Sequence, residues 1–154
     1  MFSKFAPLIK KTFMLFPKKV KYRKWQTGRK NPKKLLSADT RGTSLSFGSF
    51  GLKAQSQARV TSSQIESARR ALSRCVGKTG KTWIRIFPDR PVTAKASEVP
   101  MGKGKGDLKH YVAEVRSGRI IFELDGIPEN VAREGLRKAG TKLPLKVKFV
   151  KREI

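Results

Sequence analysis

Tyr111-Val-Ala-Glu-Val115 and Ile120-Ile-Phe-Glu-Leu124 are two apolar runs separated by a short polar stretch that contains Ser117-Gly118. Runs of this length, rich in β-branched and aromatic residues, are typical of strands. A short connection with a glycine between two such runs indicates a hairpin. The sequence therefore predicts that residues 111–115 and 120–124 pair with each other.

Three further segments indicate strands around this pair. Residues 83–87, Trp-Ile-Arg-Ile-Phe, alternate and end at the proline-rich stretch Pro88–Pro91. Residues 145–149 alternate leucine, valine and phenylalanine with lysines, which predicts a strand with one buried and one basic face. Residues 45–54 place glycines between apolar residues and predict short strand pieces with sharp turns.

Two segments have helical periodicity. Thr61 and Gln64 have capping-box spacing at the start of the first helix, and Gly77 is a stop signal at its end. Pro128 marks the first turn of the second helix, which Gly140 ends. The residues expected to face a core are Ile65, Ala68, Leu72, Cys75 and Val76 in the first helix and Val131, Ala132, Leu136 and Ala139 in the second. Two helices on one side of an antiparallel or mixed sheet define an α+β domain.

The composition is strongly basic. The chain has 154 residues, of which 38% are hydrophobic, which is enough for one compact core. Its 36 Lys and Arg residues against 11 Asp and Glu give a net charge of +25, and this self-repulsion favours a polyanionic partner. Nucleic acid fits best; an anionic membrane surface is the weaker alternative, because the charge is not confined to one amphipathic helix. No apolar run approaches the length of a membrane span.

The N-terminal third carries the densest charge. Residues 1–13 form an extension that is compatible with an upstream start or a presequence, and residues 14–43 form a basic arm with too little apolar surface to fold alone. We expect the arm to become ordered on RNA, with its aromatic residues available for stacking. The remaining residues, 44–154, form the single α+β domain. The candidate RNA-binding residues of the arm are Lys18, Lys19, Lys21, Tyr22, Arg23, Lys24, Trp25 and Arg29.

A second basic surface lies on the first helix, where Arg70 and Arg74 fall opposite the apolar face and Arg69 lies at its flank. Such arginines are commonly a solvated face. In a chain of this charge, they add to a surface expected to contact phosphate.

The third basic feature is a loop in which glycine and lysine alternate, Met101-Gly102-Lys103-Gly104-Lys105-Gly106. Glycines without Cβ atoms let the backbone approach another molecule closely, and the lysines supply point charges for phosphate. A flexible solvated loop is the competing interpretation. The pattern does not match the dinucleotide-binding fingerprint, and residues 77–82 do not match the spacing or the strand–loop–helix order of a Walker A loop.

Catalytic and metal-binding residues have no recognisable arrangement in the sequence. The acidic residues are scattered, and one Cys and one His cannot by themselves form a structural zinc site. Cys75 is expected in the core, and His110 at a strand start is more typical of a surface or RNA-stacking residue. We therefore expect no enzyme activity, no cofactor and no metal.

Several segments, in order along the chain, resemble the bacterial-type family of large-subunit ribosomal protein sixteen. They are Pro17–Lys24, Ser46–Ala54, Gln64–Ala71, Trp83–Asp89, Met101–Gly106 and Phe122–Gly126. The resemblance implies an α/β-hammerhead-like α+β domain with a basic N-terminal arm. It also implies binding to large-subunit ribosomal RNA near the base of the central protuberance, beside neighbouring ribosomal proteins.

The resemblance further implies contacts with transfer RNA in the aminoacyl site, with the peptidyl site as a further option. Carried over by position, the arm and Lys53, Arg69, Arg70 and Arg74 would contact ribosomal RNA, and residues 101–106 would point to the functional centre. A bacterial cytoplasmic ribosome is expected, with an organellar ribosome as the alternative. A general basic nucleic-acid-binding protein outside the ribosome is the alternative function.

The chain departs from the family pattern at three places. Residues 1–13 lie outside it, and Met14 is where a family member would start. Pro100 replaces the arginine that many members have before the glycine–lysine loop. His110-Tyr111 replaces the commoner Tyr-Trp, which keeps one aromatic ring and changes any stacking there.

Overall fold

The structure is a computed structural model that describes residues 15–26 and 37–152. Its elements in chain order are β1 (Phe50–Ala54), β2 (Ala58–Thr61), α2 (Ser62–Val76), β3 (Lys81–Ile84), β4 (Arg90–Ala94), β5 (Asp107–Val115), β6 (Ile120–Asp125), α3 (Glu129–Gly140) and β7 (Val147–Lys151). The predicted α+β class is confirmed. The strands form two sheets, however, with orders β3-β6-β1-β7 and β2-β5-β4, and every pairing is antiparallel.

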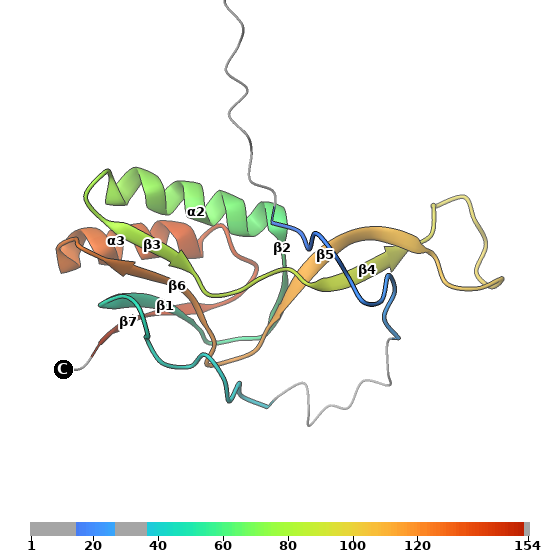
Figure 1. Cartoon of the computed structure of the whole chain (residues 1–154), viewed down its shortest axis with the longest axis horizontal. Helices are drawn as coiled ribbons and strands as arrows, with labels where there is room; N and C mark the ends of the chain where they lie inside the picture. Colours follow the sequence, from blue (N-terminus) through green and yellow to red (C-terminus); the bar gives the residue numbers. More distant parts are fainter. Residues whose placement is uncertain (1–14, 27–36, 153–154) are drawn as a thin grey trace, which may run out of the picture.

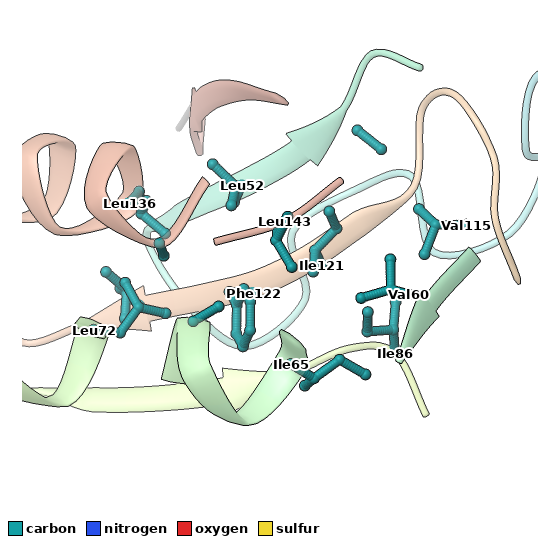
Figure 2. Packing of buried hydrophobic residues seen from close by; sticks show 14 of the residues in the cluster. Leu52, Val60, Ile65, Leu72, Ile86, Val115, Ile121, Phe122, Leu136 and Leu143 are labelled. Atoms are coloured by element: carbon teal, nitrogen blue, oxygen red, sulfur yellow. The ribbon is translucent and has the colours of Figure 1, made fainter. Parts of the chain in front are cut away.

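Both helices lie on the same side of the four-stranded sheet (Figure 1). Their apolar faces and the inner face of the sheet form one core, in which Ile65, Leu72, Phe122 and Leu136 have no exposed surface (Figure 2). β4 and β5 extend away from this body and end in the loop that joins them (Figure 1). The core therefore fixes the base of a long two-stranded projection.

Helix α2 begins and ends as predicted. The side chain of Thr61 accepts a hydrogen bond from the Gln64 N–H, and the Gln64 side chain accepts one from the Thr61 N–H at 2.9 Å, which completes the capping box. Ile65, Ala68, Leu72 and Val76 are buried, whereas Cys75 is half-buried against Gly135 of α3. In α3, Val131 was expected in the core but is 37% exposed.

The predicted hairpin between residues 111–115 and 120–124 is wrong. β5 belongs to the three-stranded sheet and β6 to the four-stranded sheet, so the turn between them carries the chain from one sheet to the other. The turn is bonded to other segments: the Gly118 N–H donates to the Ala54 carbonyl at 2.7 Å, and the Ser117 carbonyl accepts from the Asp39 N–H at 2.8 Å. These long-range bonds separate the two strands.

Other strand limits also differ from the sequence prediction. β3 covers Lys81–Ile84 instead of residues 83–87, and β7 covers Val147–Lys151 instead of residues 145–149. β4 was missed because Pro88 and Pro91 indicated a turn. Pro91 fits there because β4 is an edge strand, where a missing N–H costs no ladder bond.

The segment 44–49 lies against the four-stranded sheet, and the carboxylate of Glu123 holds it there. Glu123 has no exposed surface, and its Oε2 accepts hydrogen bonds from the N–H groups of Phe47 at 2.7 Å and Gly48 at 2.8 Å. The Ser46 N–H is 3.2 Å from the same oxygen, and the Arg85 guanidinium pairs with Oε1. Every donor is supplied by the protein, so this buried charge is fully compensated.

Gly48→Ala is expected to lower the free energy of unfolding by about 1–3 kcal/mol, the usual cost of overpacking. A Cβ at this position would lie 2.5 Å from the Leu124 carbonyl oxygen, and backbone atoms on both sides would have to shift. Urea denaturation measures the change, with Ser46→Ala as the control because Ser46 is exposed. Equal unfolding free energies for the two variants would show that the segment is not pressed against the sheet.

Candidate nucleic-acid interface

The glycine–lysine loop lies at the tip of the β4/β5 projection (Figure 1). Gly102 and Gly104 have positive φ values of 108° and 96°, and Lys103 between them has φ 50°. A Cβ added to Gly102 or Gly104 would meet nothing within 4 Å, so these glycines serve the backbone conformation rather than packing within the chain. Met101 is 90% exposed, and all of residues 101–105 are exposed.

The arm contacts the base of this loop. The Lys24 ammonium is 3.3 Å from Asp107 Oδ1 and 3.4 Å from the Lys105 carbonyl oxygen. In return, the Lys105 ammonium donates to the Trp25 carbonyl, and the Arg90 guanidinium carbon lies 5.9 Å from the centroid of the Trp25 ring. Two segments predicted separately are thus one continuous surface.

Four further cations, in the first described part of the arm, face solvent. Lys18, Lys19, Lys21 and Arg23 are exposed, and none has an ion-pair partner in the part of the chain that the structure describes. Tyr22 is 62% exposed, with the Lys21 ammonium 5.5 Å from its ring centroid. Arg29 and residues 1–13 lie outside the described residues. The visible arm therefore offers free cations beside exposed aromatic rings, a combination suited to RNA.

On α2, the arginines divide into two kinds. Arg69 and Arg70 pair with the nearly buried Glu66 at 2.8 and 3.1 Å. The hydrogen bond from Arg69 is the largest effect on the pKa of Glu66 and, together with Arg70, holds it below its ordinary value despite burial. Arg74 is exposed, and no ion-pair partner for it is found among the described residues. Phosphate binding on this face would thus depend more on Arg74 than the sequence suggested.

A shallow groove of about 450 Å³ follows α2 beside these arginines. Serine hydroxyls and cationic side chains line most of it, together with Ala71 and the Glu66 carboxylate that pairs with Arg70; the hydroxyl and cationic residues are Ser62, Ser63, Ser67, Arg70, Arg74 and Lys142. Small hydroxyl residues next to guanidinium groups suit a phosphate backbone. Lys53 lies apart from this groove, half-buried on β1 opposite Lys148 of β7.

Sequence reasoning missed the residues that join the arm to the projection. Asp107 binds the Lys24 ammonium and Arg90 lies against the Trp25 ring, whereas Lys95 donates to the Gly102 carbonyl within the loop itself. Lys24 and Asp107 are 83 residues apart. Contacts between residues so distant in the chain produce no periodicity or spacing that a single sequence would show. The pairing of Glu66 with Arg69 and Arg70 was visible, since it has the i,i+3 and i,i+4 spacing of a helical ion pair.

Residues 15–26 and 37–152 contain no group of three or more His, Cys, Asp or Glu side chains placed to hold a metal. Neither helix in the same part of the chain is long and apolar enough to span a bilayer. The fold and the charge distribution define a small, basic α+β protein in which the projection and the arm form one continuous cationic surface.

Comparison with known proteins identifies the family. The family model for ribosomal protein L16p/L10e matches residues 17–150, and the chain belongs to this family of ribosomal proteins, which are structural components and not enzymes. The chain is 51% identical over 141 residues to the large ribosomal subunit protein uL16 of Paracidovorax citrulli, covering 92% of this chain and 99% of that protein. The protein of the same name from Vibrio cholerae is 48% identical over 141 residues, which are again 92% of this chain and 99% of that protein. That of Bartonella bacilliformis is 51% identical over 139 residues, 90% of this chain and 98% of the relative.

Proposed function

We propose that this protein is a constituent of the large ribosomal subunit that binds large-subunit ribosomal RNA through its arm and the exposed face of α2. The matched relatives are named for that subunit and are bacterial, which supports a bacterial cytoplasmic ribosome. The family resemblance supports a position near the base of the central protuberance, next to other subunit proteins.

The glycine–lysine loop has a separate role in this proposal, which is contact with transfer RNA in the aminoacyl site. The observation that carries it is the position of the loop at the end of the β4/β5 projection, with the arm bound at its base. An arm held in ribosomal RNA would fix the base of the projection and leave Lys103 free to reach a mobile ligand. No ion pair or hydrogen bond occupies the Lys103 side chain in the described parts of the chain.

Replacing Lys103 and Lys105 together with alanine is expected to leave incorporation into the subunit nearly unchanged. Transfer RNA affinity in the aminoacyl site should fall by about 1 kcal/mol, or somewhat more for charge-assisted contacts. Lys103→Ala alone should produce most of this loss, because the Lys105 ammonium is already bonded to Trp25. Filter binding of transfer RNA to ribosomes with each variant measures both effects.

The matched control is Lys109→Ala, which removes an exposed lysine of β5 outside the loop and should leave affinity unchanged. Subunits that lack the double variant would show that the loop anchors the protein instead. Unchanged transfer RNA affinity would show that the loop is solvated and has no ligand.

A further inference from the structure

A stacked aromatic pair joins segment 44–49 to β3 of the four-stranded sheet, with Phe47 exposed and Trp83 half-buried. Phe47 is 58% exposed, and its ring is stacked on Trp83 with centroids 6.1 Å apart and planes 20° from parallel. The Arg85 guanidinium carbon lies 4.9 Å from the Phe47 centroid. A large part of the phenyl ring is thus in water although it has neighbours on the protein side.

The backbone that carries Phe47 is held firmly. Its N–H and that of Gly48 donate to Glu123, and the same carboxylate binds Arg85, the cation beside the ring. Gly48 lies so close to the Leu124 carbonyl that no side chain fits between them. One buried carboxylate therefore fixes the positions of both the ring and the guanidinium, so little conformational entropy is left to lose when a ligand binds.

Cations alternate with the aromatic residue along β3. Lys81 and Trp83 are two residues apart on the strand, so they share one face. Arg85 continues the same alternation, since its N–H donates to the Ile121 carbonyl at 2.9 Å. β3 is an edge strand of its sheet, so no further strand covers the outer side of the row formed by Lys81, Trp83 and Arg85.

The carboxylates of this face are already bonded. Glu123 is buried and paired with Arg85, and Asp125, opposite Lys81, accepts a hydrogen bond from the Ser49 hydroxyl at 2.6 Å. The accessible groups are the exposed ring of Phe47 and the exposed ammonium of Lys81, with the half-buried Asp125 carboxylate beside that lysine. This combination binds single-stranded nucleic acid by stacking a base on the ring and holding the adjacent phosphate.

We propose that Phe47 is the stacking platform for an unpaired nucleobase of large-subunit ribosomal RNA, with Lys81 at the neighbouring phosphate. The inference rests on the proposed function for its choice of RNA, and it assigns a binding site separate from the arm, the loop and α2. It also gives the buried Glu123 carboxylate a purpose, because that group positions the platform.

The test compares Phe47→Leu, which removes the ring, with Phe47→Tyr, which keeps it. Binding of each purified full-length protein to large-subunit ribosomal RNA is measured by filter binding over a range of salt concentrations. Leucine should weaken binding about tenfold, as for loss of one stacked base, and tyrosine should leave it near that of the unchanged protein. The slope of log affinity against log salt concentration should be the same for both variants and the unchanged protein, because neither substitution removes a phosphate contact.

Phe87→Leu is the matched control, since Phe87 is 48% exposed and has no stacked ring in the described structure. It should bind like the unchanged protein. Ultraviolet cross-linking of the unchanged protein in assembled subunits adds a measurement that needs no variant, and it should give a nucleotide attached to the peptide that contains Phe47.

Equal RNA affinity of Phe47→Leu and the unchanged protein would overturn the proposal that Phe47 stacks a base. Equal losses of affinity in the leucine and tyrosine variants would overturn it too. A cross-link of this peptide to another protein instead of RNA would also overturn it and would identify a protein-docking surface. These results differ from failure of the proposed function, in which the unchanged protein itself would bind ribosomal RNA no better than duplex DNA.

Discussion

Glu123→Gln is expected to lower the free energy of unfolding of the free protein by about 3 kcal/mol, the scale for breaking a buried ion pair. The substitution keeps the shape of the side chain but removes the charge that three consecutive N–H groups and Arg85 share. The Arg85 side chain is only 19% exposed and would be left without its anion. Urea denaturation of the purified protein measures the loss.

The pH dependence of stability provides an independent check. Burial would raise the pKa of Glu123, but the bonds from Gly48, Phe47 and Ser46 and the charge of Arg85 outweigh it and lower the pKa below its usual 4.5. A carboxyl with a lowered folded pKa contributes stability above its unfolded pKa and loses it as the pH falls through the folded pKa. The unchanged protein should therefore lose this contribution below about pH 4.5, and Glu123→Gln should lack that part of the acid transition.

Glu114→Gln is the control for both measurements. Glu114 is 43% exposed and pairs with Arg59, which is 50% exposed, and with Arg90, which is 18% exposed, so its loss should cost clearly less than that of the fully buried Glu123. Equal effects of the two substitutions would contradict the assignment of Glu123 as the group that holds segment 44–49 on the sheet.

Replacing four exposed cations of the arm that have no ion-pair partner among the described residues, Lys18, Lys19, Lys21 and Arg23, with glutamine is expected to produce the largest effect on RNA binding. Each lost phosphate contact should reduce the slope of log affinity against log salt concentration by about 0.7–0.9, so four should reduce it by about 3. Binding should weaken by about a thousandfold near 0.1 M salt. Lys24 is left in place, since its ammonium is bonded to Asp107 and to the loop. Filter binding of large-subunit ribosomal RNA across a salt series gives both quantities.

A variant with the same change in net charge separates this interface from a general polycation effect. Its four cations are exposed and lie near the C-terminal end of the chain: Arg137, Lys146, Lys148 and Arg152. It should show a clearly smaller change in slope than the arm variant. Equal changes in the two variants would favour a general basic nucleic-acid-binding protein over a specific constituent of the subunit.

Local signals made part of the fold predictable. The capping box of Thr61 and Gln64, the apolar spacing up to Val76 and the stop at Gly77 all lie within one helix, so the sequence predicted α2 correctly. Strand partners were not predictable in the same way. Alternation identifies β5 and β6 as strands, but their separation into two sheets depends on bonds of the intervening turn to Ala54 and Asp39, far away in the sequence.

The candidate interface shows the same division. Charge density identified the arm and the glycine–lysine loop, because composition is a local property. Their contact through Lys24, Asp107, Lys105 and Trp25 could not be predicted, since it depends on how the β4/β5 projection passes the arm. The three arginines of α2 also differ in a way that depends on the folded side chains, because Glu66 pairs with Arg69 and Arg70, whereas Arg74 has no ion-pair partner among the described residues.

The proposed function places this protein in the large ribosomal subunit, held there by contacts with ribosomal RNA. Sedimentation of cell extract through a sucrose cushion after a high-salt wash tests it most directly, with the protein detected by quantitative mass spectrometry. We expect the protein to remain with the large subunit at about the same stoichiometry as other proteins of that subunit. Its release into the supernatant, or its sedimentation with the small subunit or with DNA, would contradict the claim.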